Sequence, residues 1–523
     1  MPITQREVIA FLSTPRAYGR RRGRIERIDT HISIVFLVGV RAYKLKRDVT
    51  FPYLDYSTLE RRRAACEREV RLNRRTAPDV YRAAVAVTLE RDGRLALGGL
   101  GEPVEWLVEM VRFDGRALLD RLADQQRFPV DLAHELGGTI ARFHDHALPR
   151  RDYGGEAGIR RVIDGNLAEM LEDRSGTLDP RKCATLHDRS SALVDRAALL
   201  LDARRLHGLV RQCHGDLHLH NVFLADGVPT IFDAIEFNDD FACIDVMYDF
   251  AFLLMDLLHR GLRPHANAAL NGYFEVRPDP AGLSLLPLVL SCRAAVRAKV
   301  SLAEARVQRD AEAEARRRRD ARAYLELAQA VLTPARPVLV AIGGLSGSGK
   351  STLARRLAPA VGGAPGAVVL RTDVIRKHLF GVPESRRLPD SAYDAETTAR
   401  VYARAVHLAE ACLRAGQAVL LDAVFGDVRH RQAVERLAAE AGVPFCGLWL
   451  DVPYRTAARR LHARRGDASD AGIRVLQQQA RKDLGPVHWV RVDAGGGADQ
   501  VALNARQVLA AAEQEPVAVA DVP

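Results

Sequence analysis

Several features are scarce in this 523-residue sequence, and each scarcity excludes a class of protein. There are seven cysteines, an odd number at scattered positions, and no C-x-x-C pair. This favours reduced thiols in a cytosol over a disulfide framework or a structural zinc site. No run of about 18 uncharged apolar residues exists, so we expect no membrane span and no membrane partner. The N-terminus lacks the apolar core of a signal peptide, so the expected location is cytoplasmic.

Aromatic residues are also few, at 6%, although 48% of the residues are hydrophobic. Burial is therefore not limiting, and a chain of this length is expected to form about two to four domains. The formal net charge is +10, but the arginine clusters at residues 20–24, 61–63 and 316–319 lack interleaved aromatics. Solvated helix faces and phosphate handling account for such charge, so we expect no nucleic-acid partner.

The most informative stretch, residues 344–352, fits the Walker A pattern G-x-x-x-x-G-K-[ST]. The apolar run 338–342 predicts a buried strand before it, and residues 353–357 predict a helix after it. Glycines let backbone N–H groups converge on an anion, and the helix N-terminus adds the positive end of its dipole. The predicted ATP-binding loop consists of Gly344, Leu345, Ser346, Gly347, Ser348, Gly349, Lys350, Ser351 and Thr352.

Within this loop two side chains have predicted chemical roles. Lys350 is expected to reach the outer phosphates and to assist transfer, and the Ser351 hydroxyl is expected to ligate Mg²⁺. ATP and Mg²⁺ are therefore the predicted cofactors.

A second dense block runs from His214-Gly215-Asp216 through Asn221 and a turn at residues 226–227 to an apolar strand that ends at Asp233. Carboxylate and amide oxygens suit a hard cation, and phosphoryl transfer mainly needs positioning and charge neutralisation. A hairpin whose polar residues merely cap turns stays an open alternative. Histidines 214, 218 and 220 could suggest zinc, but a matching set of Cys and His ligands is missing.

These residues resemble the catalytic core of aminoglycoside phosphotransferases and other kinase-like small-molecule phosphotransferases. The resemblance implies that Asp216 is the catalytic carboxylate facing the acceptor hydroxyl. It implies that Asn221 and Asp233 hold Mg²⁺ and that Asp249 braces the loop. Glu236 is a further carboxylate that this reading places near the metal.

The upstream segments 32–38 and 41–46 predict a β-hairpin, and residues 59–75 predict a helix. By the same resemblance Lys44 contacts the ATP phosphates and Glu69 pairs with it. Lys46, on the same strand face, is the runner-up, and an exposed strand charge is the alternative for either lysine. The glycine-rich loop of protein kinases is absent, and residues 29–33 stand in its place. This departure leaves open a non-catalytic kinase-like binding module fused to a P-loop ATPase or nucleotide switch.

Beyond the phosphate loop, residues 368–373, 419–422 and 445–450 predict buried strands. This half resembles small-molecule P-loop kinases such as the gluconate, shikimate and adenylyl-sulfate kinases and the zeta-toxin group. The resemblance implies a catalytic base at Asp373, a substrate contact at Arg376 and Mg²⁺ orientation through water at Asp422. It also implies a lid that contains Arg460 and Arg464. An exposed basic helix and a strand-end turn are the alternatives for the arginines and for Asp373.

Residues 28–500 together resemble bifunctional aminoglycoside phosphotransferase/ATP-binding proteins. The expected fold is an α+β kinase-like domain at residues 1–332, with a small antiparallel sheet and a helical lobe. A linker at 333–337, an α/β P-loop domain with a parallel sheet at 338–512 and a disordered tail at 513–523 are expected to follow. The expected function is transfer of the γ-phosphoryl group of ATP, at two nucleotide sites, to a hydroxyl of a small molecule.

Overall fold

A computed structural model describes residues 3–463 and 468–514 of the chain. The chain divides into two compact units. The first comprises Met1–Pro129, Arg142–Val162 and Val194–Asp256, and the second comprises Val130–Ala141, Ile163–Leu193 and Leu257–Pro523. The predicted linker at 333–337 stays a prediction, and the predicted tail lies outside the described residues from position 515 onward.

The first unit contains a six-stranded antiparallel sheet with the order β1-β2-β3-β8-β6-β7. Its strands are β1 (Glu26–Asp29), β2 (Ser33–Val38), β3 (Arg41–Lys46), β6 (Tyr81–Leu89), β7 (Leu95–Leu97) and β8 (Glu102–Val111). The predicted hairpin is confirmed as β2 and β3, which pair Val35 with Lys44. The two-residue turn between two apolar runs fixes that register.

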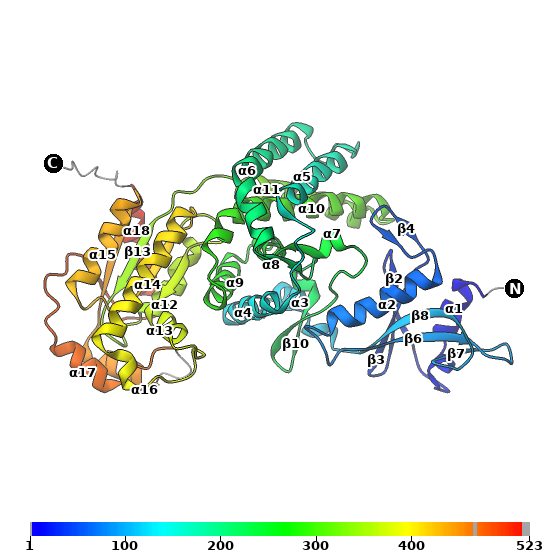
Figure 1. The fold of residues 1–523 in the computed structure, drawn as a ribbon, viewed down its shortest axis with the longest axis horizontal. Helices are drawn as coiled ribbons and strands as arrows, with labels where there is room; N and C mark the ends of the chain where they lie inside the picture. Colours follow the sequence, from blue (N-terminus) through cyan, green and yellow to red (C-terminus); the bar gives the residue numbers. More distant parts are fainter. Residues whose placement is uncertain (1–2, 464–467, 515–523) are drawn as a thin grey trace. The chain divides into compact units, whose positions relative to one another are not determined.

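Helix α2 (Leu59–Asn73) covers one face of this sheet, against β6 and β8 (Figure 1). Its buried side chains Cys66 and Val70 pack with Ala42 and Val108 of the strands. The opposite face packs against the N-terminal helix α1 (Gln5–Leu12) through Val8 and other apolar side chains. Because both faces are covered, the strand that carries Lys44 and Lys46 is held on both sides.

The motif-rich block of the first unit folds into short strands and one buried helix. These are β9 (Val210–Gln212), β10 (Val222–Ala225), β11 (Val228–Ile231), β12 (Cys243–Asp245) and α8 (Val246–His259). Strands β10 and β11 form the predicted hairpin around the turn at residues 226–227. The loop from Cys213 to Asn221 therefore lies between the β9–β12 pair and this hairpin.

Long helices make up much of the rest of the chain: α4 (Val130–His146), α5 (Gly155–Leu171), α6 (Pro180–Leu206), α9 (Arg263–Val276), α10 (Pro280–Val307) and α11 (Ala311–Val331). The Ala-, Arg- and Glu-rich sequence of residues 302–331 predicts one long helix, and this prediction is wrong. The chain breaks at residues 308–310, and Asp310 caps α11 by accepting a hydrogen bond of 2.9 Å from the amide of Ala313. An N-terminal cap of this kind favours the start of a new helix at Ala311.

Helix α10 is, among the described residues, the one helix long and apolar enough to cross a membrane. However, 72% of its most apolar 18-residue stretch is buried inside the structure. Burial of that kind is typical of a core helix, and α10 packs along α11.

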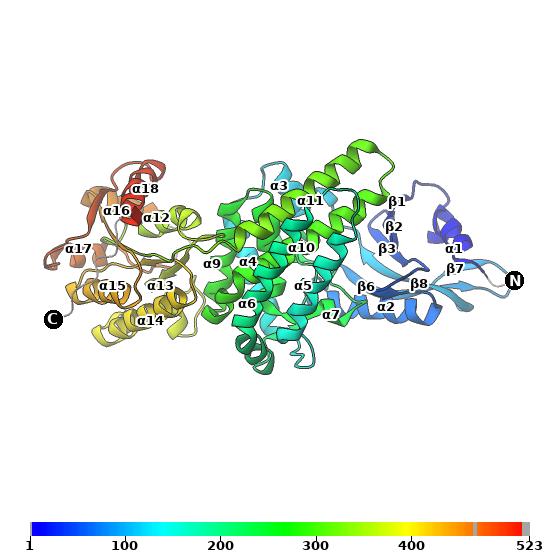
Figure 2. The ribbon, with the colours of Figure 1, turned by 90° about the horizontal axis from the view of Figure 1, so that it is seen from above.

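The second unit contains a parallel five-stranded sheet with the order β14-β15-β13-β16-β17. Its strands are β13 (Leu339–Gly343), β14 (Val368–Arg371), β15 (Val419–Asp422), β16 (Phe445–Asp451) and β17 (Val490–Asp493). The helices around it are α12 (Lys350–Leu357), α13 (Thr372–Leu379), α14 (Ala395–Arg414), α15 (Val428–Glu440), α16 (Tyr454–Ala463), α17 (Ile473–Arg481) and α18 (Ala498–Gln514). Helices α13, α14 and α15 lie on one side of the sheet, and α12 and α18 lie on the other (Figure 2).

Helix α9 closes the open edge of this sheet at β14. Asn271 Oδ1 accepts a hydrogen bond of 2.7 Å from the amide of Val369, and the side-chain amides of Asn267 and Asn271 donate to the carbonyl of Ala367. Two asparagine side chains thus satisfy backbone groups that an edge strand otherwise leaves unpaired. The expected fold classes, an antiparallel kinase-like sheet and a parallel P-loop sheet, are both confirmed.

Candidate active sites

The first candidate site begins with a buried ion pair between β3 and α2. Lys44 Nζ donates to Glu69 Oε1 at 3.0 Å, and the Glu69 side chain has no exposed surface. Lys44 also donates to Asp233 Oδ1 at 2.5 Å. The lysine of the strand, the glutamate of the helix and the aspartate that follows β11 therefore meet at one point, although they are distant in the sequence.

The charges of these residues shift one another's pKa values. Burial alone would lower the pKa of Lys44, but the charges of Asp233 and Glu69 outweigh burial and raise that pKa well above its ordinary value. Burial would raise the pKa of Asp233, but Lys44 dominates and lowers it. Lys44 is therefore a cation and Asp233 an anion at neutral pH, as a phosphate contact and a metal ligand need to be.

Lys46 lies deeper than Lys44, with 2% of its side chain exposed. Its ammonium group binds both Glu69 and Glu236, and the Tyr56 hydroxyl donates to the same oxygen of Glu236. Glu236 is thus already bonded to Lys46 and Tyr56, which does not favour its predicted place near the metal. Tyr56 was not found from the sequence, because its partner lies 180 positions further along the chain.

The loop that contains Asp216 is held from behind by α8. Asp249 accepts hydrogen bonds from the amides of His214 (3.1 Å) and Gly215 (2.8 Å), and its Oδ2 lies 3.1 Å from His144 Nε2 of α4. His214 in turn binds the carbonyl of Phe232 at 2.8 Å through Nε2. Burial lowers the pKa of His214, so its ring is neutral at pH 7 and has a structural contact. His144 is a brace that the sequence interpretation missed.

The loop held by Asp249 brings together three predicted site residues, Asp216, Asn221 and Asp233. The Asn221 side-chain amide donates to Asp216 Oδ2 at 3.0 Å and to the Asp216 carbonyl at 2.9 Å. The Asn221 carbonyl accepts from the amide of Phe232, the residue before Asp233. Asp233 itself has a φ of +64°, a conformation that non-glycine residues adopt rarely and that clusters at functional sites.

The donor set of this site suits a hard divalent cation. Asn221 and Asp233 offer amide and carboxylate oxygens, which are the ligands that Mg²⁺ prefers. A second group, His144, Cys213 and Asp249, places its ligand atoms within 4.8 Å of one another. Asp249 already serves two backbone amides there, and Cys213 Sγ contacts the carbonyl of Ile244 at 3.4 Å. That buried group is accounted for by its role in holding the loop.

The second candidate site forms where β13 turns into α12. Gly344 (φ +139°) and Gly347 (φ +80°) adopt conformations that disfavour other residues. A Cβ on Gly344 would lie 2.9 Å from the Leu450 carbonyl oxygen, and one on Gly347 would lie 2.6 Å from the Ala457 carbonyl oxygen. The predicted strand–loop–helix context of the phosphate loop is therefore present, and these glycines are needed for close backbone approach.

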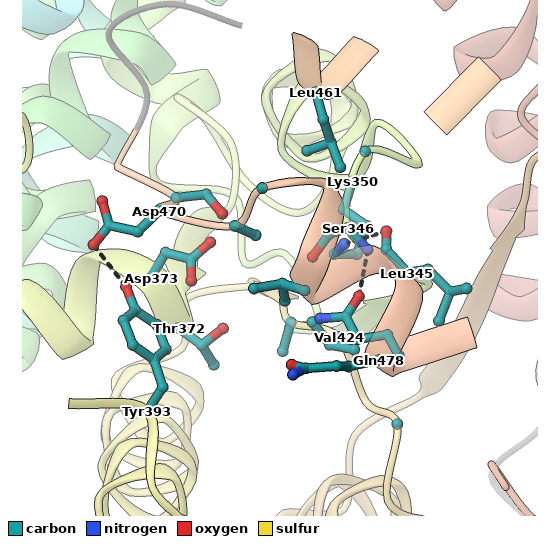
Figure 3. A pocket seen from close by; sticks show the side chains of 18 of the residues that line it. Leu345, Ser346, Lys350, Thr372, Asp373, Tyr393, Val424, Leu461, Asp470 and Gln478 are labelled. Atoms are coloured by element: carbon teal, nitrogen blue, oxygen red, sulfur yellow. Dashed lines mark hydrogen bonds between the residues drawn. The ribbon is translucent and has the colours of Figure 1, made fainter. Parts of the chain in front are cut away.

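This loop borders a cavity of about 1850 Å³ (Figure 3). The predicted residues on its wall are Leu345, Ser346, Gly347, Gly349, Lys350, Ser351, Thr352, Asp373, Arg376, Asp422 and Arg460. Gly344 and Ser348 also belong to the loop but are buried. Arg464 lies outside the described residues. The structure thus gathers predicted residues from the phosphate loop, β15 and the helices α12, α13 and α16 around one space.

Individual contacts refine this picture. Asp373 lies in the first turn of α13, two residues after β14 ends, so the prediction that it ends the strand is slightly displaced. Asp422 ends β15 and lies 3.5 Å from Arg371 Nε. Arg376 is 6% exposed, donates to the carbonyl of Ala392 at 2.7 Å and lies 4.7 Å over the Tyr393 ring.

Two further interactions at this cavity were not found from the sequence. Lys377, which is fully buried, binds both oxygens of Asp470 at 2.9 and 2.8 Å. Tyr393 also donates to Asp470 at 2.7 Å (Figure 3). The amide of Ser346, in the phosphate loop, donates to Gln479 Oε1 at 2.8 Å. Both contacts join residues more than 75 positions apart, so no local pattern could reveal them.

Comparison with known proteins agrees with the two fold classes. Residues 42–286 match the phosphotransferase enzyme family, and residues 339–482 match an AAA domain. An adenylyl-sulfate kinase of Myxococcus xanthus is 36% identical over 110 residues, which are 21% of this chain and 55% of that enzyme. A solved choline/ethanolamine kinase family protein from Mesorhizobium loti is 15% identical, covers 63% of this chain and 99% of its own, and has a TM-score of 0.37.

The two family matches define a kinase-type phosphotransferase module joined to a P-loop kinase-like module. An uncharacterized protein of Mycobacterium tuberculosis is 32% identical over 480 residues, or 90% of this chain and 92% of that protein. The chain belongs to the same family as this mycobacterial protein, in agreement with the resemblance expected from its motifs.

Proposed function

We propose that the protein is a cytoplasmic, ATP-dependent phosphotransferase with two nucleotide sites. Each site would transfer the γ-phosphoryl group of ATP to a hydroxyl of a small molecule. The observation that supports this most strongly is that the chain contains two separate groups of residues of the same chemical kind. Each group combines a lysine, oxygen ligands suited to Mg²⁺ and a further carboxylate.

At the first site, Lys44 rather than Lys46 would contact the ATP phosphates. Lys44 is 13% exposed and contacts Asp233, whereas Lys46 is enclosed by Glu69 and Glu236. Asn221 and Asp233 would hold the metal, and bound Mg²⁺ would neutralise charge on the phosphates. Asp216, whose carboxylate is oriented by Asn221, would accept the proton of the acceptor hydroxyl.

At the second site, the phosphate loop would hold the nucleotide through Lys350 and its backbone amides. Ser351 and Asp422 would hold the metal, with Asp422 acting through water. Asp373 would act as base and Arg376, one turn further along α13, would orient the acceptor. Arg460, which donates to the Ser348 carbonyl at 3.2 Å, would close the site on the phosphates and exclude water.

One observation favours a second candidate for the first unit, a binding module without chemistry. The turn at residues 30–33, which stands where protein kinases have glycines, is fixed by side chains. Ser33 donates its amide to Thr30 Oγ1 at 2.9 Å, and Arg47 Nε donates to the Thr30 carbonyl at 2.8 Å. Only the P-loop module would then turn over nucleotide, as an ATPase or switch.

A product-resolved screen separates the two. Purified protein is incubated with Mg·ATP and a panel of hydroxyl-bearing metabolites, and phosphorylated products are identified by mass spectrometry. Asp216→Asn should abolish products of the first site and spare those of the second, and Lys350→Ala should do the reverse. Slow ATP hydrolysis that ignores every acceptor and is lost only in Lys350→Ala would establish the switch instead. Product formation that survives both substitutions would refute the proposed sites.

A further inference from the structure

Helices α16 and α17 form a small cover beside the phosphate loop. Leu476 of α17 is buried against Ala457 and Leu461 of α16, and Leu345 of the loop packs on the same cluster. Apart from Leu476 and the half-buried Gln479, the side chains of α17 are exposed. The helix is therefore attached to the rest of the module at few points.

One of those points is the phosphate loop itself. Gln479 Oε1 accepts a hydrogen bond of 2.8 Å from the amide of Ser346. Backbone amides of such a loop are the groups that bind phosphate oxygens. A neutral amide oxygen thus occupies a donor that a phosphate would need. The single N–H of Ser346 cannot form well-aligned hydrogen bonds to Gln479 and to a phosphate oxygen at the same time.

A second attachment lies at Asp470, shortly before α17 begins at Ile473. Asp470 receives the Lys377 ammonium, the Leu388 amide at 2.9 Å and the Tyr393 hydroxyl at 2.7 Å. Lys377 is fully buried, and breaking a buried ion pair is strongly destabilising because it leaves an uncompensated buried charge. A single neutral hydrogen bond is far weaker. Asp470 is therefore the fixed end of the segment, and Gln479 is the end that can be released.

From this contrast we propose that Gln479 is a latch on the nucleotide site. Its side chain holds α17 on the phosphate loop, and the phosphates of an incoming nucleotide displace it from the Ser346 amide. Nucleotide binding thereby frees the Gln479 end of α17, while Asp470 keeps the segment anchored beside Asp373 and Arg376. The proposal rests on the nucleotide role of the second site.

Two substitutions of one residue give opposite expectations. Gln479→Ala removes the competing acceptor, so the loop should bind Mg·ATP about three- to tenfold more tightly, the factor that one ordinary hydrogen bond represents. Gln479→Glu keeps the acceptor and adds a negative charge beside the phosphates. It should weaken Mg·ATP binding by about tenfold or more. Gln478→Ala is the matched control, because Gln478 lines the same cavity from the same helix and is exposed.

The measurement is isothermal titration of the full-length protein with Mg·ATP, with Lys350→Ala identifying the signal of the loop. Hydrogen exchange of residues 473–481 is followed in parallel. Wild-type α17 should exchange faster after Mg·ATP is added, and Gln479→Ala should exchange fast without it. An affinity that is unchanged or weaker in Gln479→Ala would overturn the latch while leaving the second site intact. A wild-type protein and a Gln479→Ala variant that both fail to bind at the loop would refute the second site and the latch together.

Discussion

The two neighbouring lysines of β3 make a quantitative prediction, because the structure gives them different partners. In Lys46→Met, the buried carboxylate of Glu236 would retain only the Tyr56 hydroxyl, and Glu69 would retain only Lys44. Removing one partner of a buried ion pair costs about 3–5 kcal/mol. For units of this size about 1 kcal/mol corresponds to 2–4 °C, so the expected fall in Tm is roughly 6–20 °C.

Lys44→Met should behave differently. Glu69 keeps Lys46, and the Asp233 side chain is 39% exposed, so water can solvate it. The expected cost is therefore about 1 kcal/mol or less, a shift of roughly 2–4 °C. If Lys44 contacts the phosphates, this variant should nevertheless lose Mg·ATP binding at the first site.

Differential scanning calorimetry of the full chain, with and without Mg·ATP, measures both quantities. Lys350→Ala identifies the transition of the first unit, because that substitution should leave it in place. A Lys46→Met variant as stable as the wild type, or a Lys44→Met variant that bound nucleotide normally at the first site, would refute these different roles of the two lysines.

Three further substitutions test other parts of the structure. Asp249→Ala leaves the amide of Gly215 without its acceptor. Turnover at the first site, measured by product formation, should therefore fall by at least tenfold. The free energy of unfolding, measured by urea denaturation, should fall by about 2–4 kcal/mol. Burial raises the pKa of Glu384 to about 7, so the folded protein holds a proton that the unfolded chain releases nearer pH 4.5. The free energy of unfolding should therefore fall by on the order of 1–2 kcal/mol between about pH 5 and 8, and this slope should vanish in Glu384→Gln. Lys377→Met leaves Asp470 without its ion-pair partner and should lower the Tm by several degrees. An unchanged Tm would show that this contact does not stabilise the chain before α17.

The sequence was most informative where chemistry is local. The phosphate loop needs glycines, a lysine and a hydroxyl within nine positions, and the hairpin of β2 and β3 needs two alternating runs around a two-residue turn. Both were predicted, as was the strand end at Asp422, whereas Asp233 lies two residues beyond the end of β11. The loop of Asp216 and Asn221 was found for the same reason, since its polar residues stand within six positions.

Contacts between distant segments could not be predicted in this way. Period two places Lys44 and Lys46 on one strand face, so the pattern alone could not choose between them. The difference arises from where Asp233 and Glu236 meet β3 after folding. Gln479 is one glutamine in a polar helix, and nothing local marks it as a partner of Ser346. The break before α11 was missed although Asp310 is a residue type that favours helix N-termini.

The central claim is that one chain holds two separate sites for ATP and Mg²⁺, and counting bound nucleotide tests it most directly. Equilibrium dialysis with labelled Mg·ATP should give two nucleotides per wild-type chain, one in Lys350→Ala, one in Asp233→Asn and none in the double variant. A wild-type count of one, unchanged by Asp233→Asn, would contradict the account.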